Sequence, residues 1–391
     1  MVKRLGLEVS LMVSEAVKLS DVDVIAAYPI TPQTHIVEHL SEIVADGELD
    51  AEYICVESEH SAMSACAGSS AVGARTYTAT ASQGLQLMSE ILFITSAMRL
   101  PVVMSVANRT LSAPLSIWND HSDIMANRDC GWIMIFVENG QETFDQTICA
   151  FRIAEDRRVL LPTIINLDGF ILSHVIEPFE PVEKDLVKKF LPPFRPPFTM
   201  HPDKPVTMGA FAMPDLFTET KKAHDVALRG SYDVICEVWD EWEKLTGRRY
   251  TPVEEYKTED ADVVFVMMGS FCELGMEVVD MLRKEGKKVG LVKIRLFRPF
   301  PISDILFTLS KFKNLIVIDR ALSVGGIGGP LASEIKSVLY RLDKKPNIFN
   351  FIAGLSGRDV PPSEFVKIYE MAMNDLSRGS WEDFTMVGVR E

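Results

Sequence analysis

The hydrophobic residues of this chain form short continuous runs, separated by stretches in which apolar residues recur every three or four positions. Runs that are apolar throughout, rather than at alternate positions, are typical of strands buried on both faces of a parallel sheet. The first part of the chain therefore predicts a series of such strands. They cover residues 22–28, 53–56, 76–80, 101–107, 132–137 and 160–167.

Helical spacing of apolar residues predicts helices between these runs, around residues 36–44 and 85–96. A third helix is predicted over residues 58–73, where nearly every residue is Ala, Ser or Gly. Side chains this small would let the helix lie very close to the sheet or to another subunit.

The second half of the chain repeats the alternation after a different kind of segment. Residues 177–205 are rich in proline and predict an extended, semi-rigid connector rather than a helix or strand. A helical tract follows at about 215–246. The later strands are predicted at 263–268, 289–294, 315–318 and 348–352, and the later helices at 271–285, 301–310, 328–341 and 363–376.

These elements predict an α/β protein with two parallel-sheet domains. We place the first domain at residues 1–248, including the proline-rich arm (177–205) and the helical tract, and the second at residues 249–391. A length of 391 residues with 47% hydrophobic composition gives enough core for this division.

Charge and hydropathy limit the partners and the location. The formal net charge of −15 argues against nucleic acid or an anionic membrane as a partner. No apolar run reaches the length of a membrane span, and the N-terminus lacks a signal-peptide pattern. We therefore expect a cytoplasmic protein with no membrane contact.

The cysteines argue against a metal centre within this chain. The six cysteines are scattered, with no CxxC pair and no grouping with histidines, so we expect neither an iron–sulfur cluster nor a zinc site here and assign no metal-ligating residue. Scattered cysteines within apolar runs are typical of a reducing cytoplasm.

Unusual residues follow the predicted strands. Thr31 lies between two prolines in YPITPQT (28–34), a stiff loop directly after the first strand. Glu59 follows the second strand and Arg109 the fourth, while the third ends in TATASQG (78–84), a turn that could bind an anion or an amide. Open α/β sheets bind ligands at the carboxyl ends of their strands, and an arginine there suits a carboxylate. Each residue also has a structural explanation, as a helix cap, a helix-end charge or a surface ion pair.

Phosphate-binding motifs are missing or ambiguous. No GxGxxG follows the first strand and no GxxxxGK[ST] occurs, which argues against a dinucleotide-binding domain and a nucleoside triphosphate site. The glycine-rich stretch 325–329 could surround a phosphate, but a tight turn with close helix packing is the favoured interpretation.

Six motifs together resemble the alpha subunits of the 2-oxoacid:ferredoxin oxidoreductases, above all those acting on pyruvate. The motifs are YPITPQT (28–34), VESEHSA (56–62), TATASQGL (78–85), NRTLSAPLSIWNDHSD (108–123), DGFILSH (168–174) and FRPFP (297–301). The resemblance spans nearly the whole chain. It implies a pyrimidine-binding domain for thiamine diphosphate, followed by a transketolase-C-like domain.

The same resemblance implies roles for particular residues. Glu59 is similar to the glutamate that hydrogen-bonds the aminopyrimidine ring, and Ser82 falls in the cofactor-binding turn. Thr31, Arg109 and Tyr28 fall at substrate-binding positions, with Arg109 matching the guanidinium that binds the 2-oxoacid carboxylate.

The resemblance also implies partners. A beta subunit would hold the diphosphate through Mg²⁺, and gamma and delta subunits would carry [4Fe–4S] clusters and much of the coenzyme A site. The complex would convert pyruvate and coenzyme A reversibly to acetyl-CoA and CO₂, with ferredoxin as electron acceptor. Two alternatives remain open: a branched-chain or other 2-oxoacid as substrate, or a non-catalytic α/β scaffold subunit.

Overall fold

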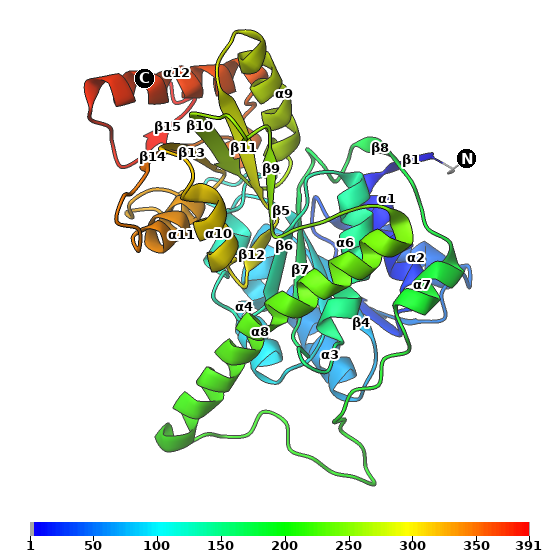
Figure 1. The fold of residues 1–391 in the computed structure, drawn as a ribbon. Coiled ribbons are helices and arrows are strands. Elements are labelled where there is room, and N and C mark those ends of the chain that lie inside the picture. Colours follow the sequence, from blue (N-terminus) through cyan, green and yellow to red (C-terminus); the bar gives the residue numbers. More distant parts are fainter. Residues whose placement is uncertain (1–3, 391) are drawn as a thin grey trace.

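The six strands predicted in the first part of the chain, together with a later strand that was not predicted, form a seven-stranded sheet with the order β12-β6-β7-β5-β4-β2-β3. The structure is a computed structural model, and it describes residues 4–390 (Figure 1). The strands are β2 (Val24–Ala27), β3 (Glu52–Cys55), β4 (Thr76–Thr80), β5 (Val103–Asn108), β6 (Ile133–Phe136), β7 (Thr163–Asp168) and β12 (Leu296–Arg298). All pairings are parallel except that of β12 with β6. The parallel sheet expected here is thus present, with one antiparallel edge strand.

Helices cover both faces of this sheet. One face is covered by four helices, which form a hydrophobic core with it: α1 (Val9–Leu19), α2 (Thr34–Ala45), α6 (Gly140–Ala154) and part of α8 (Pro214–Thr246). The other face packs against α3 (Glu59–Ala71) and α4 (Ser82–Ala97), and the short α5 (Ser122–Ala126) lies beside β5 and α4. The small-residue helix α3 contacts β2, β4 and α4, which agrees with its expected close approach to the sheet.

The second sheet has the order β15-β14-β13-β10-β11-β9. Its strands are β9 (Val253–Tyr256), β10 (Val263–Met267), β11 (Val289–Ile294), β13 (Asn314–Asp319), β14 (Asn347–Ile352) and β15 (Thr385–Met386). Its helices are α9 (Phe271–Lys284), α10 (Ile302–Leu309), α11 (Pro330–Leu339) and α12 (Pro362–Arg378), with a 3₁₀ turn at Leu355–Gly357. Only β9 runs antiparallel to its neighbour.

The two sheet units are joined by more than a linker. The core that packs α3 and α4 on the first sheet continues without a break into residues of β10, β11, α10 and α11. In addition, β12 leaves the second unit and pairs with β6, with Leu296 opposite Ile135 and Arg298 opposite Met134. The division at residues 248 and 249 remains a prediction, and this strand crosses it.

The proline-rich arm differs from the extended connector expected over residues 177–205. The structure places two short elements within or at the start of it, β8 (Ile176–Phe179) and α7 (Lys184–Phe190). Strand β8 pairs with β1 (Leu5–Glu8), and α7 buries Val187 and Phe190 in the first core. Long-range partners thus fix a segment whose local sequence favours extension. After the arm, the first turns of α8 project away from both sheets (Figure 1).

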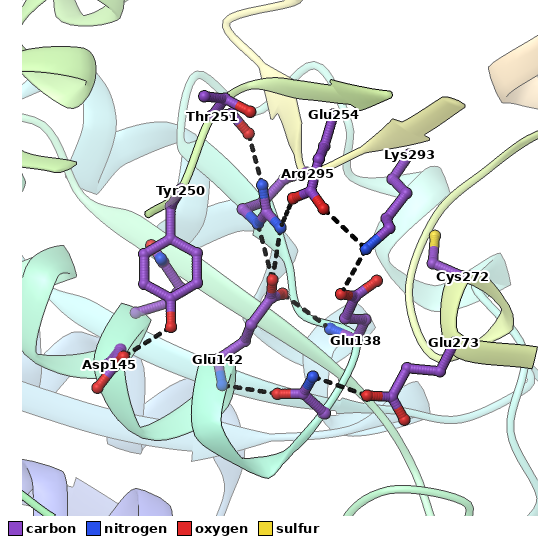
Figure 2. Close-up of polar contacts among 12 residues, drawn as sticks. Glu138, Glu142, Asp145, Tyr250, Thr251, Glu254, Cys272, Glu273, Lys293 and Arg295 are labelled. Carbon is purple, nitrogen blue, oxygen red and sulfur yellow. Dashed lines mark hydrogen bonds and ion pairs between the residues drawn. The ribbon is translucent and has the colours of Figure 1, made fainter. Parts of the chain in front are cut away.

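A buried polar network links the two units at the start of α6 (Figure 2). Lys293 donates a 2.9 Å hydrogen bond to Glu138 and makes a 2.9 Å ion pair with Glu254. Arg295 donates to Glu142 and, at 2.8 Å, to Glu254. The network holds more carboxylates than cations. Burial and the charge of Glu142 accordingly raise the pKa of Glu138 to about 7.

Across residues 4–390, no helix combines the length and the apolar character needed to cross a membrane.

Candidate active site

The predicted site residues all lie at one edge of the first sheet. Thr31 follows β2, Glu59 follows β3, Ser82 follows β4 and Arg109 follows β5. Because these strands are parallel and adjacent in the order β5-β4-β2-β3, their carboxyl ends meet along one line. The sequence prediction of a shared sheet edge is therefore confirmed by the topology.

Glu59 is a buried carboxylate without a protein partner. It is the first residue of α3, where the side chain of Ser58 caps the helix by accepting from the backbone N–H of Ser61. Glu59 is 7% exposed, yet within residues 4–390 its carboxylate makes no hydrogen bond or ion pair. A helix-end charge explains its place at the N-terminus but not its burial, since buried charges are normally paired.

A glycine forms the wall beside this carboxylate. A Cβ at Gly84 would lie 2.7 Å from Oε1 of Glu59 and 2.5 Å from Oγ1 of Thr80. Thr80 Oγ1 is itself buried and unpartnered in the described part of the chain. The first turn of α4 thus packs so closely against Glu59 and Thr80 that only glycine fits at position 84.

Arg109 and Thr31 are brought together across the sheet edge. The guanidinium of Arg109 donates from Nη1 to the backbone carbonyl oxygen of Thr31 at 2.9 Å and from Nε to that of Ser116 at 3.0 Å. Arg109 is 7% exposed, and burial lowers its pKa. These bonds fix the orientation of the guanidinium and leave Nη2 without a partner among residues 4–390.

Asp123 holds the loops around the site, a role that the sequence analysis did not assign. Its carboxylate accepts hydrogen bonds from the backbone N–H groups of Ser82, Arg109 and Ile124, at 2.7–3.0 Å, and from the side chain of Asn108 at 3.1 Å. Asp123 is fully buried, and this burial raises its pKa to about 6. Ser82 has a positive φ of 47°, and the bond from its N–H to Asp123 helps to hold this rare conformation.

The remaining predicted residue, Tyr28, lies at the same edge but with a freer side chain. It is 37% exposed, and its hydroxyl makes no hydrogen bond within the described residues. Its backbone carbonyl accepts from Nε2 of Gln33 at 2.8 Å, which stabilises the YPITPQT loop. The hydroxyl of Ser82, in contrast, is engaged by the carbonyl of Thr110 at 2.6 Å.

Comparison with known proteins identifies the family. Residues 15–238 match the family described as pyruvate flavodoxin/ferredoxin oxidoreductase, thiamine diphosphate-binding. The chain belongs to this family. Residues 261–365 match the pyruvate:ferredoxin oxidoreductase core domain II.

Curated relatives cover nearly the full chain. The pyruvate synthase subunit PorA of Methanocaldococcus jannaschii is 50% identical, over 97% of this chain and 96% of that protein. The PorA subunit of Thermotoga maritima is 46% identical over 95% of each chain. The ketoisovalerate oxidoreductase subunit VorA of Pyrococcus horikoshii is 44% identical over 86% of each chain.

Solved structures share the fold at low sequence identity. A 2-oxoglutarate:ferredoxin oxidoreductase from Magnetococcus marinus aligns with a TM-score of 0.72 and 19% identity over 95% of this chain, which spans 65% of that longer chain. A split-gene transketolase aligns with a TM-score of 0.58 and 13% identity over 95% of this chain and 99% of its own. Both support the two-domain α/β fold expected of the family.

A second cluster beyond the predicted site joins the sheet edge to the other unit. Asp168, at the end of β7, accepts from His121 at 2.7 Å, from the backbone N–H of Ser270 at 2.8 Å and from Arg320 at 2.9 Å. Burial alone would raise the pKa of Asp168, but the charges of Arg320 and His121 hold it well below its usual range. The Arg320 guanidinium also lies 4.1 Å from the centre of the Phe271 ring.

The glycine-rich stretch forms a turn whose helix is already capped. The backbone N–H groups of Leu331 and Ala332 at the start of α11 donate to Asp319, at 2.8 and 3.2 Å, and that of Gly329 donates to Asn350 at 2.9 Å. A Cβ at Gly329 would meet Asp319 at 2.0 Å. Since these donors are occupied, the structure favours the tight turn over a phosphate cradle.

Proposed function

We propose that this chain is the alpha subunit of a pyruvate:ferredoxin oxidoreductase, a pyruvate synthase. With partner subunits it would convert pyruvate and coenzyme A to acetyl-CoA and CO₂ and reduce ferredoxin, reversibly. The observation that carries the proposal is the buried, unpartnered carboxylate of Glu59 beside Gly84, at the same sheet edge as Arg109. The names of the relatives that are 45–50% identical support the choice of pyruvate.

Glu59, Thr80 and Gly84 suit the pyrimidine end of thiamine diphosphate. Glu59 offers an open carboxylate acceptor, Thr80 an unsatisfied hydroxyl, and Gly84 a wall with no side chain. When bound, thiamine diphosphate supplies a carbon nucleophile and an electron sink for decarboxylation. Glu59 would accept a hydrogen bond from the aminopyrimidine ring and hold a proton at the ring nitrogen that it faces, which would favour the imino tautomer, the form able to act as a base.

Arg109 and Thr31 are proposed to hold the 2-oxoacid. The guanidinium is fixed by two backbone carbonyls, and its free Nη2 side can receive a carboxylate. Thr31 and Tyr28 would add neutral hydroxyl contacts. One cation with neutral donors suits a substrate that carries a single carboxylate, as pyruvate does.

The rest of the catalytic machinery is assigned to partner subunits. We assign Mg²⁺ and the diphosphate end of the cofactor to a beta subunit, and the [4Fe–4S] clusters and much of the coenzyme A site to gamma and delta subunits. The six cysteines are free thiols, and the sequence holds no cysteine motif for an iron–sulfur cluster, which is the reason for assigning the clusters to other subunits. Free thiols also suit a location in the reducing cytoplasm.

A branched-chain 2-oxoacid is the second candidate substrate, because the VorA relative is 44% identical to this chain. An assay of the purified complex with a panel of 2-oxoacids, coenzyme A and ferredoxin separates the two. We expect the highest kcat/KM with pyruvate. A higher value with a branched-chain acid would reassign the substrate, and no turnover with any 2-oxoacid would favour a scaffold.

Calorimetry tests the division of the cofactor site. The full-length chain alone should bind thiamine diphosphate weakly, because no acidic motif for Mg²⁺ and diphosphate is evident in it, while the complex should bind tightly. Tight binding to the chain alone would contradict the shared site.

A further inference from the structure

Three potential metal ligands converge from distant parts of the chain. Glu8 ends β1, His35 is the second residue of α2, and His174 lies in the loop between β7 and β8. Each offers one ligand atom, and these atoms all lie within 4.8 Å of one another. The pairing of β1 with β8, in which Glu8 lies opposite Ile176, brings the strand end beside the loop that carries His174.

The contacts within this cluster orient its three side chains toward one another. Nδ1 of His35 lies 2.6 Å from Oε1 of Glu8, and the rings of His35 and His174 are 4.5 Å apart between centroids. Oγ of Ser173 lies 2.8 Å from Nδ1 of His174, which fixes that ring and leaves its Nε2 for a ligand. All three ligand residues are half-buried, so an ion could enter from solvent.

We propose that Glu8, His35 and His174 bind a divalent first-row cation, with Zn²⁺ as the best fit. Two imidazoles and one carboxylate are a ligand set that Zn²⁺ accepts, with a remaining position for water. Zinc bond lengths place two ligand atoms roughly 3.3 Å apart around a tetrahedral ion.

An ion pair without a metal explains only part of the cluster. A charged His35 would pair with the carboxylate of Glu8. It would also place its positive charge beside the imidazole of His174, and that contact is not stabilising. The chain contains a useful contrast in His39 of the same helix, whose Nε2 and Nδ1 face Glu15 at 3.5 Å and Glu42 at 3.4 Å. Those carboxylates face opposite ring nitrogens, so one ion cannot bind all three groups.

The position of the cluster indicates what the ion would do. The ring of His174 packs at a tilt against that of Phe170, and Phe170 packs likewise against Trp118, with centroid distances of 4.6 and 4.7 Å. A metal would thus tie α2, which follows the Thr31 loop, to the loop after β7. The site departs from the expectation of no metal in this chain, because its ligands share no short sequence motif. It is independent of the function proposed above.

Titration of the metal-free full-length chain with Zn²⁺, in competition with a chromophoric chelator, tests the site. We expect one tight equivalent, a rise in unfolding temperature on binding, and a visible spectrum of reduced coordination number with Co²⁺ in place of Zn²⁺. The variants His174→Gln and Glu8→Gln should each lose about 10- to 100-fold or more in affinity. The control His39→Gln should bind as the wild type does.

Two further readings make the outcome decisive. Far-UV circular dichroism and the unfolding temperature of each metal-free variant show whether it folds. If His174→Gln does not fold, Glu8→Gln, which lies on a peripheral strand, carries the test. Absence of a tight equivalent in the wild type overturns the site. Full affinity in a folded His174→Gln or Glu8→Gln, or an equal loss in His39→Gln, overturns it as well.

Discussion

The guanidinium of Arg109 reaches across β4 to donate a 2.9 Å hydrogen bond to the backbone carbonyl oxygen of Thr31. This bond joins the loops that follow β2 and β5, which are not neighbours in the sheet. Arg109, which is proposed to bind the substrate carboxylate, therefore also fixes the loop that carries Thr31, whose hydroxyl is proposed to contact the substrate.

Replacement of this arginine tests the substrate site. Arg109→Lys keeps the charge but loses the planar fork. Loss of part of a charge-assisted hydrogen bond should cost about 1.5–3 kcal/mol, seen as a pyruvate KM about 10- to 100-fold higher. Steady-state kinetics on the complex measure this, with the exposed Arg229→Lys as control. If thiamine diphosphate affinity fell while the pyruvate KM held, Arg109 would serve the cofactor or an interface instead.

Glu59→Gln separates cofactor activation from helix stabilisation. The amide is nearly isosteric, so the fold should persist, but turnover of the complex should fall by roughly 10²–10⁴-fold. Glu57→Gln, two residues earlier and exposed, is the matched control and should retain activity. Equal turnover of the two variants would reduce Glu59 to a helix-end charge.

Gly84→Ala tests the close packing beside Glu59. Its methyl group would lie 2.5 Å from Thr80 Oγ1 and 2.7 Å from Glu59 Oε1, so the carboxylate must move. We expect weaker binding of thiamine diphosphate by the complex, measured by calorimetry, and a stability cost of about 1–3 kcal/mol. The helical Gly230→Ala meets nothing within 4 Å and should be neutral or stabilising. Unchanged cofactor affinity in Gly84→Ala would place the cofactor elsewhere.

The interdomain network should make stability depend on pH. Burial and Glu142 raise the pKa of Glu138 to about 7, above the roughly 4.3 of an unfolded glutamate. The folded chain therefore binds this proton more tightly, and the resulting stability is present at low pH and lost as pH rises toward 7. Glu138→Gln cannot lose a proton there.

We expect the apparent unfolding temperature to fall less in Glu138→Gln than in the wild type between about pH 5 and pH 8. Scanning calorimetry across that range measures the difference, and the exposed Glu219→Gln should follow the wild type. Parallel curves for Glu138→Gln and the wild type would mean that Glu138 stays charged throughout.

Asp168→Asn tests the link between the sheet edge and the second unit. The amide cannot compensate Arg320, which is 2% exposed and has Nε and Nη2 unpartnered within residues 4–390. An uncompensated buried charge should destabilise the chain by about 3–5 kcal/mol. Denaturant unfolding measures this, with the exposed Asp46→Asn as control. A loss no larger than that of the control would show that Arg320 is held by other means.

Local pattern predicted the parallel strands because each is buried on both faces and reads as a continuous apolar run. The missed elements lack that signal. Helix α6 does have apolar residues at helical spacing, Phe144, Ile148 and Phe151, but its other face carries polar residues that are also buried, among them Thr143 and Gln146. Strands β1 and β8 are partly exposed, and β12 has only three residues.

The sequence placed Thr31, Glu59, Ser82 and Arg109 at one sheet edge because parallel strands align their carboxyl ends. It could not assign Asp123 or Asp168, since their importance lies in which loops they join. Asp123 bonds segments that precede it by 14 and 41 residues, and Asp168 bonds Arg320, 152 residues later. Such partners are fixed by tertiary structure and leave no local pattern.

The pairing of β12 with β6 has a consequence for how the chain folds during its synthesis on the ribosome. Domains generally fold as they emerge, and the strands β2 to β7 are all made before residue 170. The edge strand that covers β6 is not made until residues 296–298. During the intervening synthesis β6 presents open backbone groups, which can recruit a strand from another nascent chain. Translation of the arm, α8 and the first strands of the second sheet is therefore the interval in which β6 is an open sheet edge.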